Sequence, residues 1–207
     1  MITAVCEQGS AEWLEVRTGI PTTSEFDRIV TSKGEATSSA ARNRYLHEKV
    51  GERVGGTVQV HFVGAAAERG TNLEPKAREW YAAETDQDVE QVGFIYRDAQ
   101  RRCGCSPDGL VGGQGGIEIK CPLRPQMISA LLRKACPTEY LVQAQGGLWV
   151  TGRKWWDVIV YTEDYGIPNR IWRVTRSDVI FAGFAKHIPA FCDDIDTLAA
   201  SIERLKT

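Results

Sequence analysis

The residues most suited to chemistry lie in two short segments that carry two carboxylates and a lysine. The segments are Ser106-Pro107-Asp108-Gly109-Leu110 and Ile117-Glu118-Ile119-Lys120, and a glycine-rich turn joins them. Side chains alternate across a β-strand, so Glu118 and Lys120 share one face while the two isoleucines face the core. A hairpin-like connection brings Asp108 beside Glu118.

Two carboxylates at this separation repel each other. A hard divalent cation such as Mg²⁺ relieves that repulsion, because it prefers oxygen ligands. The backbone carbonyl of Ile119 offers a third oxygen. Lys120 is then expected to face the attacking water, where its charge favours the hydroxide form and orients it toward a phosphate. The predicted chemistry is hydrolysis of a phosphate ester.

The Glu-x-Lys spacing alone is a weak signal, because the chain contains it twice. Glu74-Pro75-Lys76 is the other copy, and it lies in a helical pattern where proline would disrupt a central strand. Only Glu118 and Lys120 combine strand alternation, flanking isoleucines and an upstream aspartate. The alternative reading is an ordinary Glu/Lys pair on a solvated strand face.

The patterns of apolar residues predict an α/β fold with a mixed central sheet. A helix containing Leu73, Ala77, Trp80 and Tyr81 is expected to carry Glu74. Strands are expected at 92–96, 103–111 and 116–121 as a three-stranded meander, then at 156–161 and 170–175. Helices are expected at 10–18, from 23 or 24, around 41–50, and at 66–83, 126–134, 139–149 and 181–205, the last kinked or split at Pro189.

Composition is typical of a soluble globular protein, with 207 residues, 43% hydrophobic and 25% charged. We expect one domain spanning residues 1–207, with no membrane helix, no export leader, and a cytoplasmic location. The six cysteines are interpreted as thiols. A formal net charge of −2 argues against binding nucleic acid through bulk charge, so any such contact must be local.

Three further stretches, in the same order along the chain, carry a resemblance to a known family. The stretches are Gln8-Gly9-Ser10-Ala11-Glu12-Trp13 with Arg17-Thr18-Gly19-Ile20, Thr22 and Ser24; Arg69-Gly70-Thr71-Asn72-Leu73-Glu74; and Tyr140 to Thr151. With them, the chain resembles the λ-exonuclease-like, or YqaJ-type, phage recombination alkaline exonucleases of the PD-(D/E)xK nuclease superfamily. The similarity covers about residues 8–161, whereas 31–68 and the C-terminal helix carry no family signal.

The resemblance implies a restriction-endonuclease-like core, with a mixed central sheet flanked by helices, and a role for each matching residue. Asp108, Glu118 and the carbonyl of Ile119 would bind two Mg²⁺ ions, for which Mn²⁺ could substitute. Lys120 would be the catalytic lysine, and Glu74 would support the metal site through water. The residues that would handle the terminal 5′-phosphate or the scissile phosphate are Arg17, Ser24, Ser106 and Gln143. On inspection of the residues, Gln8 carries no such chemistry and Trp13 is interpreted as core.

The activity implied is that of a Mg²⁺-dependent exodeoxyribonuclease acting on linear double-stranded DNA in a bacterial host cell. It would degrade the 5′-ended strand, prefer 5′-phosphorylated ends, and leave 3′ single-stranded DNA for recombination. The resemblance also implies a ring-shaped homotrimer and a single-strand annealing protein as partner. Two alternatives stay open: a structure-specific or restriction-type endonuclease on the same core, and a catalytically silent DNA-binding or assembly module.

Cys103-Gly104-Cys105 could indicate a zinc site, but no second pair stands at zinc-site spacing. Two buried thiols on a strand are the expected reading.

Overall fold

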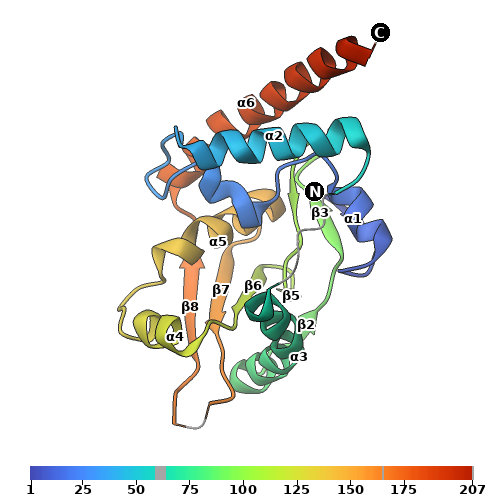
Figure 1. The fold of residues 1–207 in the computed structure, drawn as a ribbon. Coiled ribbons are helices and arrows are strands. Elements are labelled where there is room, and N and C mark those ends of the chain that lie inside the picture. Colours follow the sequence, from blue (N-terminus) through green and yellow to red (C-terminus); the bar gives the residue numbers. More distant parts are fainter. Residues whose placement is uncertain (59–63, 165, 207) are drawn as a thin grey trace.

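The computed structural model describes residues 1–58, 64–164 and 166–206 as two β-sheets surrounded by helices (Figure 1). The strands are β1 (Ile2–Ala4), β2 (Val89–Glu90), β3 (Phe94–Tyr96), β4 (Gly104–Cys105), β5 (Gly109–Val111), β6 (Gly115–Lys120), β7 (Trp155–Val160) and β8 (Arg170–Thr175). The α-helices are α1 (Ala11–Arg17), α2 (Ala40–Gly55), α3 (Ala65–Thr85), α4 (Arg124–Leu131), α5 (Thr138–Thr151) and α6 (Asp178–Glu203). Two 3₁₀ helices, η1 (Thr23–Arg28) and η2 (Arg204–Lys206), complete the chain.

The central sheet has five strands in the order β2-β5-β6-β7-β8. Its β6 and β7 strands run parallel, and the other neighbouring pairs are antiparallel. The parallel pair needs a crossover connection, which α4 and α5 supply. The expected mixed sheet is therefore present.

The expected three-stranded meander is wrong, because its middle strand is two strands in two different sheets. β4 pairs with β3 in a small sheet of order β1-β3-β4, whereas β5 pairs with β6 in the central sheet. Between them lies Ser106-Pro107-Asp108. Pro107 has no N–H to donate to a ladder, so the strand breaks there and the chain crosses from one sheet to the other.

Most of the expected helices are confirmed within a few residues, but α6 differs from its expected form. It runs unbroken from Asp178 to Glu203 with Pro189 inside it. Ile188 and Phe191 are both buried on either side of the proline, and their packing outweighs the one backbone hydrogen bond that proline removes. At the C-terminal end the apolar residues leave the core: Ile202 of α6 and Leu205 of η2 are 42% and 81% exposed.

The central sheet is covered on both faces, and α3 covers the face that the two β6 isoleucines occupy. Leu73, Ala77 and Tyr81 of α3 pack with Ile117 and Ile119 in one buried cluster. The larger core lies on the other face, among α2, α5, α6, η1 and the sheet. α2 and α6 lie against each other at the top of the view in Figure 1. The expected strand alternation is thus confirmed at β6.

A buried carboxylate joins α3 to the edge of the sheet. Asp157 of β7 is 1% exposed and accepts two hydrogen bonds from the Arg173 guanidinium, at 2.9 and 2.8 Å. The Tyr81 hydroxyl donates to the same carboxylate at 2.8 Å. Arg173 is half exposed and also stacks on the Trp155 ring at 3.9 Å. These contacts satisfy a charge that would otherwise be buried without a partner.

We therefore expect Arg173→Met to lower the free energy of unfolding by about 2–3 kcal/mol, because the buried Asp157 side chain would lose both guanidinium hydrogen bonds and keep only that of Tyr81. Urea denaturation measures this. Arg176→Met is the matched control, since its pair with Asp178 is solvent-exposed and should contribute at most about 1 kcal/mol. Equal losses in both variants would contradict the assignment.

Candidate active site

The β5–β6 hairpin brings the two carboxylates together. Its register pairs Gly109 with Ile117, and one further step along it sets Asp108 beside Glu118. Gly109 is required at this pairing, because a Cβ there would lie 2.2 Å from a methyl carbon of Val89. The turn expected in the glycine run is confirmed, with Gly112 at φ +49°.

Asp108 lies just beyond the last backbone pair of the hairpin, and its side chain continues the ladder. Its Oδ2 accepts a short 2.5 Å hydrogen bond from the Ile119 backbone N–H. The N–H and C=O of one strand residue point to the same side, so the Ile119 carbonyl also faces Asp108. A carboxyl oxygen and a carbonyl oxygen, both possible ligands of a cation, therefore face each other across the end of the hairpin.

Glu118 and Lys120 point toward α5, where Gln143 meets them. Lys120 Nζ donates to Glu118 Oε1 at 2.8 Å and to Gln143 Oε1 at 2.9 Å. Gln143 Nε2 donates to the same Glu118 oxygen at 2.6 Å. The three side chains form a closed triangle, although Gln143 lies 23 residues from Lys120 in sequence. The structure thus brings these three predicted residues together.

The α3 helix places Glu74 near the hairpin through an arginine that the sequence analysis did not single out. Arg78, one helical turn beyond, donates to Glu74 Oε1 and to the backbone carbonyl of Asp108 at 2.9 Å. Glu74 is on a helix, as expected, with Pro75 inside it. The i,i+4 spacing of Glu74 and Arg78 was visible in the sequence, but the contact with Asp108 was not.

Crowded carboxylates dominate the electrostatics of the site. Burial, the Glu118 charge and the Glu74 charge together raise the pKa of Asp108 well above its usual value, although the Ile119 N–H and Lys120 oppose this. Burial likewise raises the pKa of Glu74, against the effect of Arg78. Burial opposes the charged form of Lys120, but Glu118 outweighs it and the pKa of Lys120 is raised. Lys120 is therefore a fixed cation beside an excess of negative charge.

This donor set fits a hard divalent cation. In the part of the chain that the structure describes, no three His, Cys, Asp or Glu side chains group together to hold a metal ion. A metal here would therefore rely on Asp108, Glu118 and a backbone oxygen, for which the Ile119 carbonyl is oriented. The raised pKa of Asp108 shows that its charged form is disfavoured, and a bound cation would favour that charged form.

Two N-terminal residues that carried no expected chemistry contact the Asp108 segment directly. Gln8 Nε2 donates to the carbonyls of Val92 and Pro107, at 2.8 and 2.9 Å. Trp13 Nε1 donates to Ser106 Oγ at 2.8 Å. Trp13 packs against a buried cluster, as its interpretation as core expected, but the ring is only half-buried and its N–H also binds the site segment.

Arg17 stacks on this same tryptophan, with its guanidinium carbon 3.9 Å from the Trp13 ring centroid. No ion pair joins it to Glu12 or Glu15 within the described residues. Burial lowers the pKa of Arg17, but arginine stays charged near neutral pH. A half-buried cation therefore lies one ring away from Ser106.

Among the predicted phosphate-binding residues, Ser24 has the fewest contacts with the rest of the site. It is exposed in η1, with its Oγ 3.1 Å from Thr22 Oγ1. Across the described residues, no hydrogen bond joins it to Arg17 or Ser106. The turn before it is held by α2, where Glu52 accepts from the Gly19 N–H at 2.9 Å.

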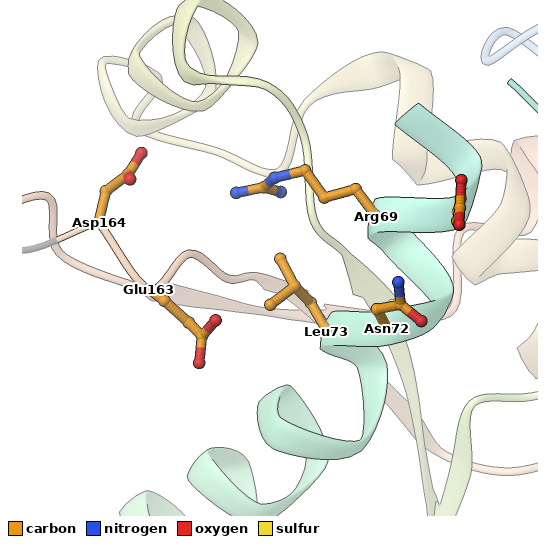
Figure 2. A pocket seen from close by; sticks show the side chains of 6 residues that line it. Arg69, Asn72, Leu73, Glu163 and Asp164 are labelled. Carbon is orange, nitrogen blue, oxygen red and sulfur yellow. The ribbon is translucent and has the colours of Figure 1, made fainter. Parts of the chain in front are cut away.

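A cavity of about 450 Å³ lies beside α3, close to the end of β6 (Figure 2). Arg69 borders it and donates to the backbone carbonyl of Cys121, the residue after Lys120, at 2.9 Å. Figure 2 shows the Arg69 guanidinium extending toward Asp164. The lining is completed by Glu68, Asn72, Leu73 and Glu163. The carboxylates of Glu68, Glu163 and Asp164 all line this cavity and make it unfavourable for a phosphate.

The structure also bears on the Cys103-Gly104-Cys105 motif and on membrane spans. The Cys103 and Cys105 thiols are buried, and burial raises the pKa of both, so the buried-thiol reading is favoured over zinc. No described helix is long and apolar enough to cross a membrane.

Comparison with known proteins decides the family. The model of the YqaJ-like viral recombinase domain matches residues 12–154. The chain belongs to the YqaJ-like viral recombinase family. The fold of this family member is similar to the crystal structure of an alkaline exonuclease (LHK-Exo) from Laribacter hongkongensis, with 32% identity, a TM-score of 0.86, and 95% and 98% of the two chains covered.

The structure of LHK-Exo in complex with dAMP matches the chain equally well, at 32% identity and TM-score 0.86, again covering 95% and 98%. A phage-related exonuclease from Haemophilus somnus 129PT shares the fold at 12% identity and TM-score 0.64, covering 88% of this chain and 96% of its own. No curated protein matches the sequence. The restriction-endonuclease-like α/β fold expected from the sequence is confirmed.

The raised pKa of Asp108 has a testable consequence for stability. Folding favours its protonated form, so the metal-free protein loses stability as pH rises from the ordinary aspartate pKa through the raised one. We expect Asp108→Asn, which can still accept from the Ile119 N–H, to have a higher Tm than the wild type in EDTA at neutral pH. For a chain of this length, 1 kcal/mol corresponds to about 2–4 °C in Tm.

Glu203→Gln, at an exposed pair with Lys206, is the control and should leave Tm nearly unchanged. Added Mg²⁺ should raise the Tm of the wild type and not that of Asp108→Asn. A lower Tm for Asp108→Asn in EDTA would show that the hydrogen bond to the charged carboxylate outweighs the repulsion.

Proposed function

We propose that the protein is a Mg²⁺-dependent exonuclease that degrades the 5′-ended strand of linear double-stranded DNA. The family and the similarity to an alkaline exonuclease support a nuclease. The observation that carries the proposal is the hairpin end, where Asp108, Glu118 and Lys120 converge with the Ile119 backbone. LHK-Exo binds dAMP, a deoxynucleoside monophosphate of the kind that stepwise DNA hydrolysis releases.

Asp108, Glu118 and the Ile119 carbonyl are the proposed metal ligands, with two Mg²⁺ ions as cofactor and Mn²⁺ as substitute. Bound there, Mg²⁺ supplies Lewis-acid polarisation of the phosphate and lowers the pKa of water. Glu74 lies within electrostatic reach of Glu118 and adds negative charge at the α3 side of the site. The hydrogen bond from Arg78 fixes the orientation of the Glu74 carboxylate.

Lys120 and Gln143 orient the reacting groups in this proposal. The hydrogen bonds from both side chains to one oxygen of Glu118 leave the other oxygen free of the triangle. Lys120 keeps its proton because its pKa is raised, so it acts as a cation that stabilises developing negative charge rather than as a base. Gln143, a neutral donor, is suited to a phosphate oxygen.

Arg17, Ser24 and Ser106 are the proposed receptors for the end of the substrate. A terminal phosphate carries nearly two negative charges, whereas a phosphodiester carries one. Glu52 and Glu25 favour the charged form of the Arg17 guanidinium, but no described carboxylate forms an ion pair with it, so it can still bind an anionic ligand. Trp13 contacts Arg17 through the face of its ring and Ser106 through its N–H.

The proposal also includes assembly and partners. A ring-shaped homotrimer around DNA would hold the substrate topologically, which suits a chain whose net charge is −2. A single-strand annealing protein is the proposed partner for the 3′ single strand. A bacterial cytoplasm is the proposed setting.

Two other functions stay as outcomes of the test. An endonuclease on the same core would cut closed circular duplex. A silent DNA-binding module would bind DNA without hydrolysis, but it would have no reason to keep mutually repelling carboxylates.

The first test incubates linear and closed circular duplex with Mg²⁺ or EDTA and follows them on gels. We expect only the linear form with Mg²⁺ to be degraded. Asp108→Asn and Glu118→Gln should reduce the rate by at least about 10³-fold, and Lys120→Ala by about 10²–10³-fold, because each removes charge complementarity at the reacting phosphate.

Lys76→Ala is the matched control, since it alters the other Glu-x-Lys copy, whose lysine is exposed and pairs with Glu163. It should keep the wild-type rate. Degradation of the circular form, or activity at the wild-type level in either carboxylate variant, would overturn the proposal.

The second test compares duplexes that end in 5′-phosphate or 5′-hydroxyl. We expect the wild type to degrade the phosphorylated duplex about tenfold faster or more, as charge-assisted hydrogen bonds contribute about 1.5–3 kcal/mol. Arg17→Ala should remove most of this preference. Trp13→Phe keeps a ring under Arg17 but loses the N–H to Ser106, so it should weaken the preference by a smaller factor.

Arg176→Ala serves as control, because this exposed arginine already pairs with Asp178 and has no contact with Trp13 or Ser106 among the described residues. Equal rates on both ends in the wild type, or a full preference in Arg17→Ala, would place the phosphate receptor elsewhere.

A further inference from the structure

The helix that follows the catalytic strand exposes large apolar side chains to solvent. Leu123, Ile128 and Leu132, in or beside α4, are 48%, 43% and 81% exposed. Arg124, Ile128 and Leu132 are spaced four residues apart and therefore form one stripe on the helix. Hydrophobic side chains grouped on one surface usually mark an interaction site.

The stripe is held rigidly from behind. Met127 and Ala130 of α4 are buried against Val160 and Trp172 of the central sheet. Arg170 donates to the carbonyl of Leu131 at 3.0 Å, which fixes the end of the helix. The exposed residues are thus not a loosely packed segment, and the helix presents them from a fixed platform.

The exposed apolar residues, of which Leu123 is the first, begin close to the proposed catalytic lysine. Only three residue steps separate Lys120 from Leu123, which limits their Cα separation to about 11 Å. Tyr140 connects the two regions, because its ring centroid lies 5.9 Å from Lys120 Nζ and it packs against the cluster under α4. Figure 1 shows α4 next to the end of β6. A DNA strand that runs from Lys120 toward α4 would reach this helix within a few nucleotides.

The charge of this segment is opposite to that of the whole chain. No Asp or Glu occurs between Glu118 and Glu139, whereas Arg124, Arg133 and Lys134 occur there in addition to Lys120. The chain as a whole has a net charge of −2. A surface that combines local positive charge with exposed aliphatic side chains is complementary to a nucleic acid with unstacked bases.

The arginines of this segment can exchange their present partners for phosphates. Arg124 pairs with Asp164 at 3.3 Å, and Arg133 pairs with Glu139 at 2.9 Å. All four side chains are at least about one-third exposed, and exposed pairs contribute at most about 1 kcal/mol. A DNA phosphate can replace such a carboxylate at small cost.

We propose that the α4 surface, formed by Leu123, Arg124, Ile128, Leu132 and Arg133, binds the unpaired end of the DNA next to the site. This inference rests on the proposed function. An enzyme that hydrolyses one strand of a duplex must separate the terminal base pairs, which costs a few kcal/mol per step. The aliphatic side chains cover the unstacked bases, and the arginines hold the adjacent backbone.

The test compares a blunt 5′-phosphorylated duplex with the same duplex mismatched at its last three base pairs. We expect the double variant Ile128→Ser/Leu132→Ser to degrade the blunt duplex about tenfold more slowly than the wild type, because the unpaired state is no longer stabilised. The mismatched end should restore most of this loss, since its bases are already unpaired.

Ile202→Ser/Leu205→Ser is the matched control. It removes two exposed apolar residues near the C-terminus, at the end of the molecule far from α4 in Figure 1, and should behave as the wild type on both substrates. Thermal unfolding and light scattering are measured for both variants. A changed oligomeric state in the α4 variant would identify this surface as a contact between copies of the chain, and would overturn the inference.

An equal loss on blunt and mismatched ends, or no loss on either, would also overturn it. Normal DNA rates with lost binding to a single-strand annealing protein would assign the surface to a protein partner instead. If the wild type degrades neither duplex, it is the proposed function that fails, and this outcome is distinguished from the others by the wild-type lanes alone.

Discussion

The repulsion between Asp108 and Glu118 is the constraint on which the rest of the site depends. A hairpin register fixes the two carboxylates on neighbouring strands, and neither can withdraw, because Asp108 is bound to the Ile119 N–H and Glu118 to Lys120 and Gln143. Burial strengthens their interaction, as the raised pKa of Asp108 indicates. The repulsion lowers the stability of the metal-free fold, and it keeps negative charge at a position where a bound cation would neutralise it.

Local patterns in the sequence were sufficient to predict the part of the site that lies on one strand. Alternation in Ile117-Glu118-Ile119-Lys120 predicted which side chains face the core. The structure confirms it, because the two isoleucines lie in one buried cluster while Glu118 and Lys120 contact each other on the opposite face of the strand. Pro75 correctly excluded the other Glu-x-Lys copy from a strand. The same reasoning failed upstream, where short apolar runs gave no signal that β4 and β5 belong to different sheets, although Pro107 marks the break.

Contacts between residues far apart in sequence could not be predicted in this way. Trp13 meets Ser106 across 93 residues, and Gln8 meets Pro107 across 99. No periodicity relates such positions, because their proximity results from how β1 and β3 pair at the edge of the small sheet. The family resemblance marked both residues as part of a motif, but it gave no physical reason for them. The hydrogen bonds now supply that reason.

These long-range contacts give the segment 106–108 two roles. Its first residue accepts from Trp13 and lies near the Arg17 cation, whereas its last residue carries a proposed metal ligand. Proline between them restricts the backbone, and Gln8 holds the proline carbonyl from outside the sheet. The proposed receptor for a strand end and the Asp108 carboxylate are therefore fixed relative to each other by three residues. A nuclease built in this way would measure its cut from the end of the strand, because the bond it reaches is set by the length of that segment.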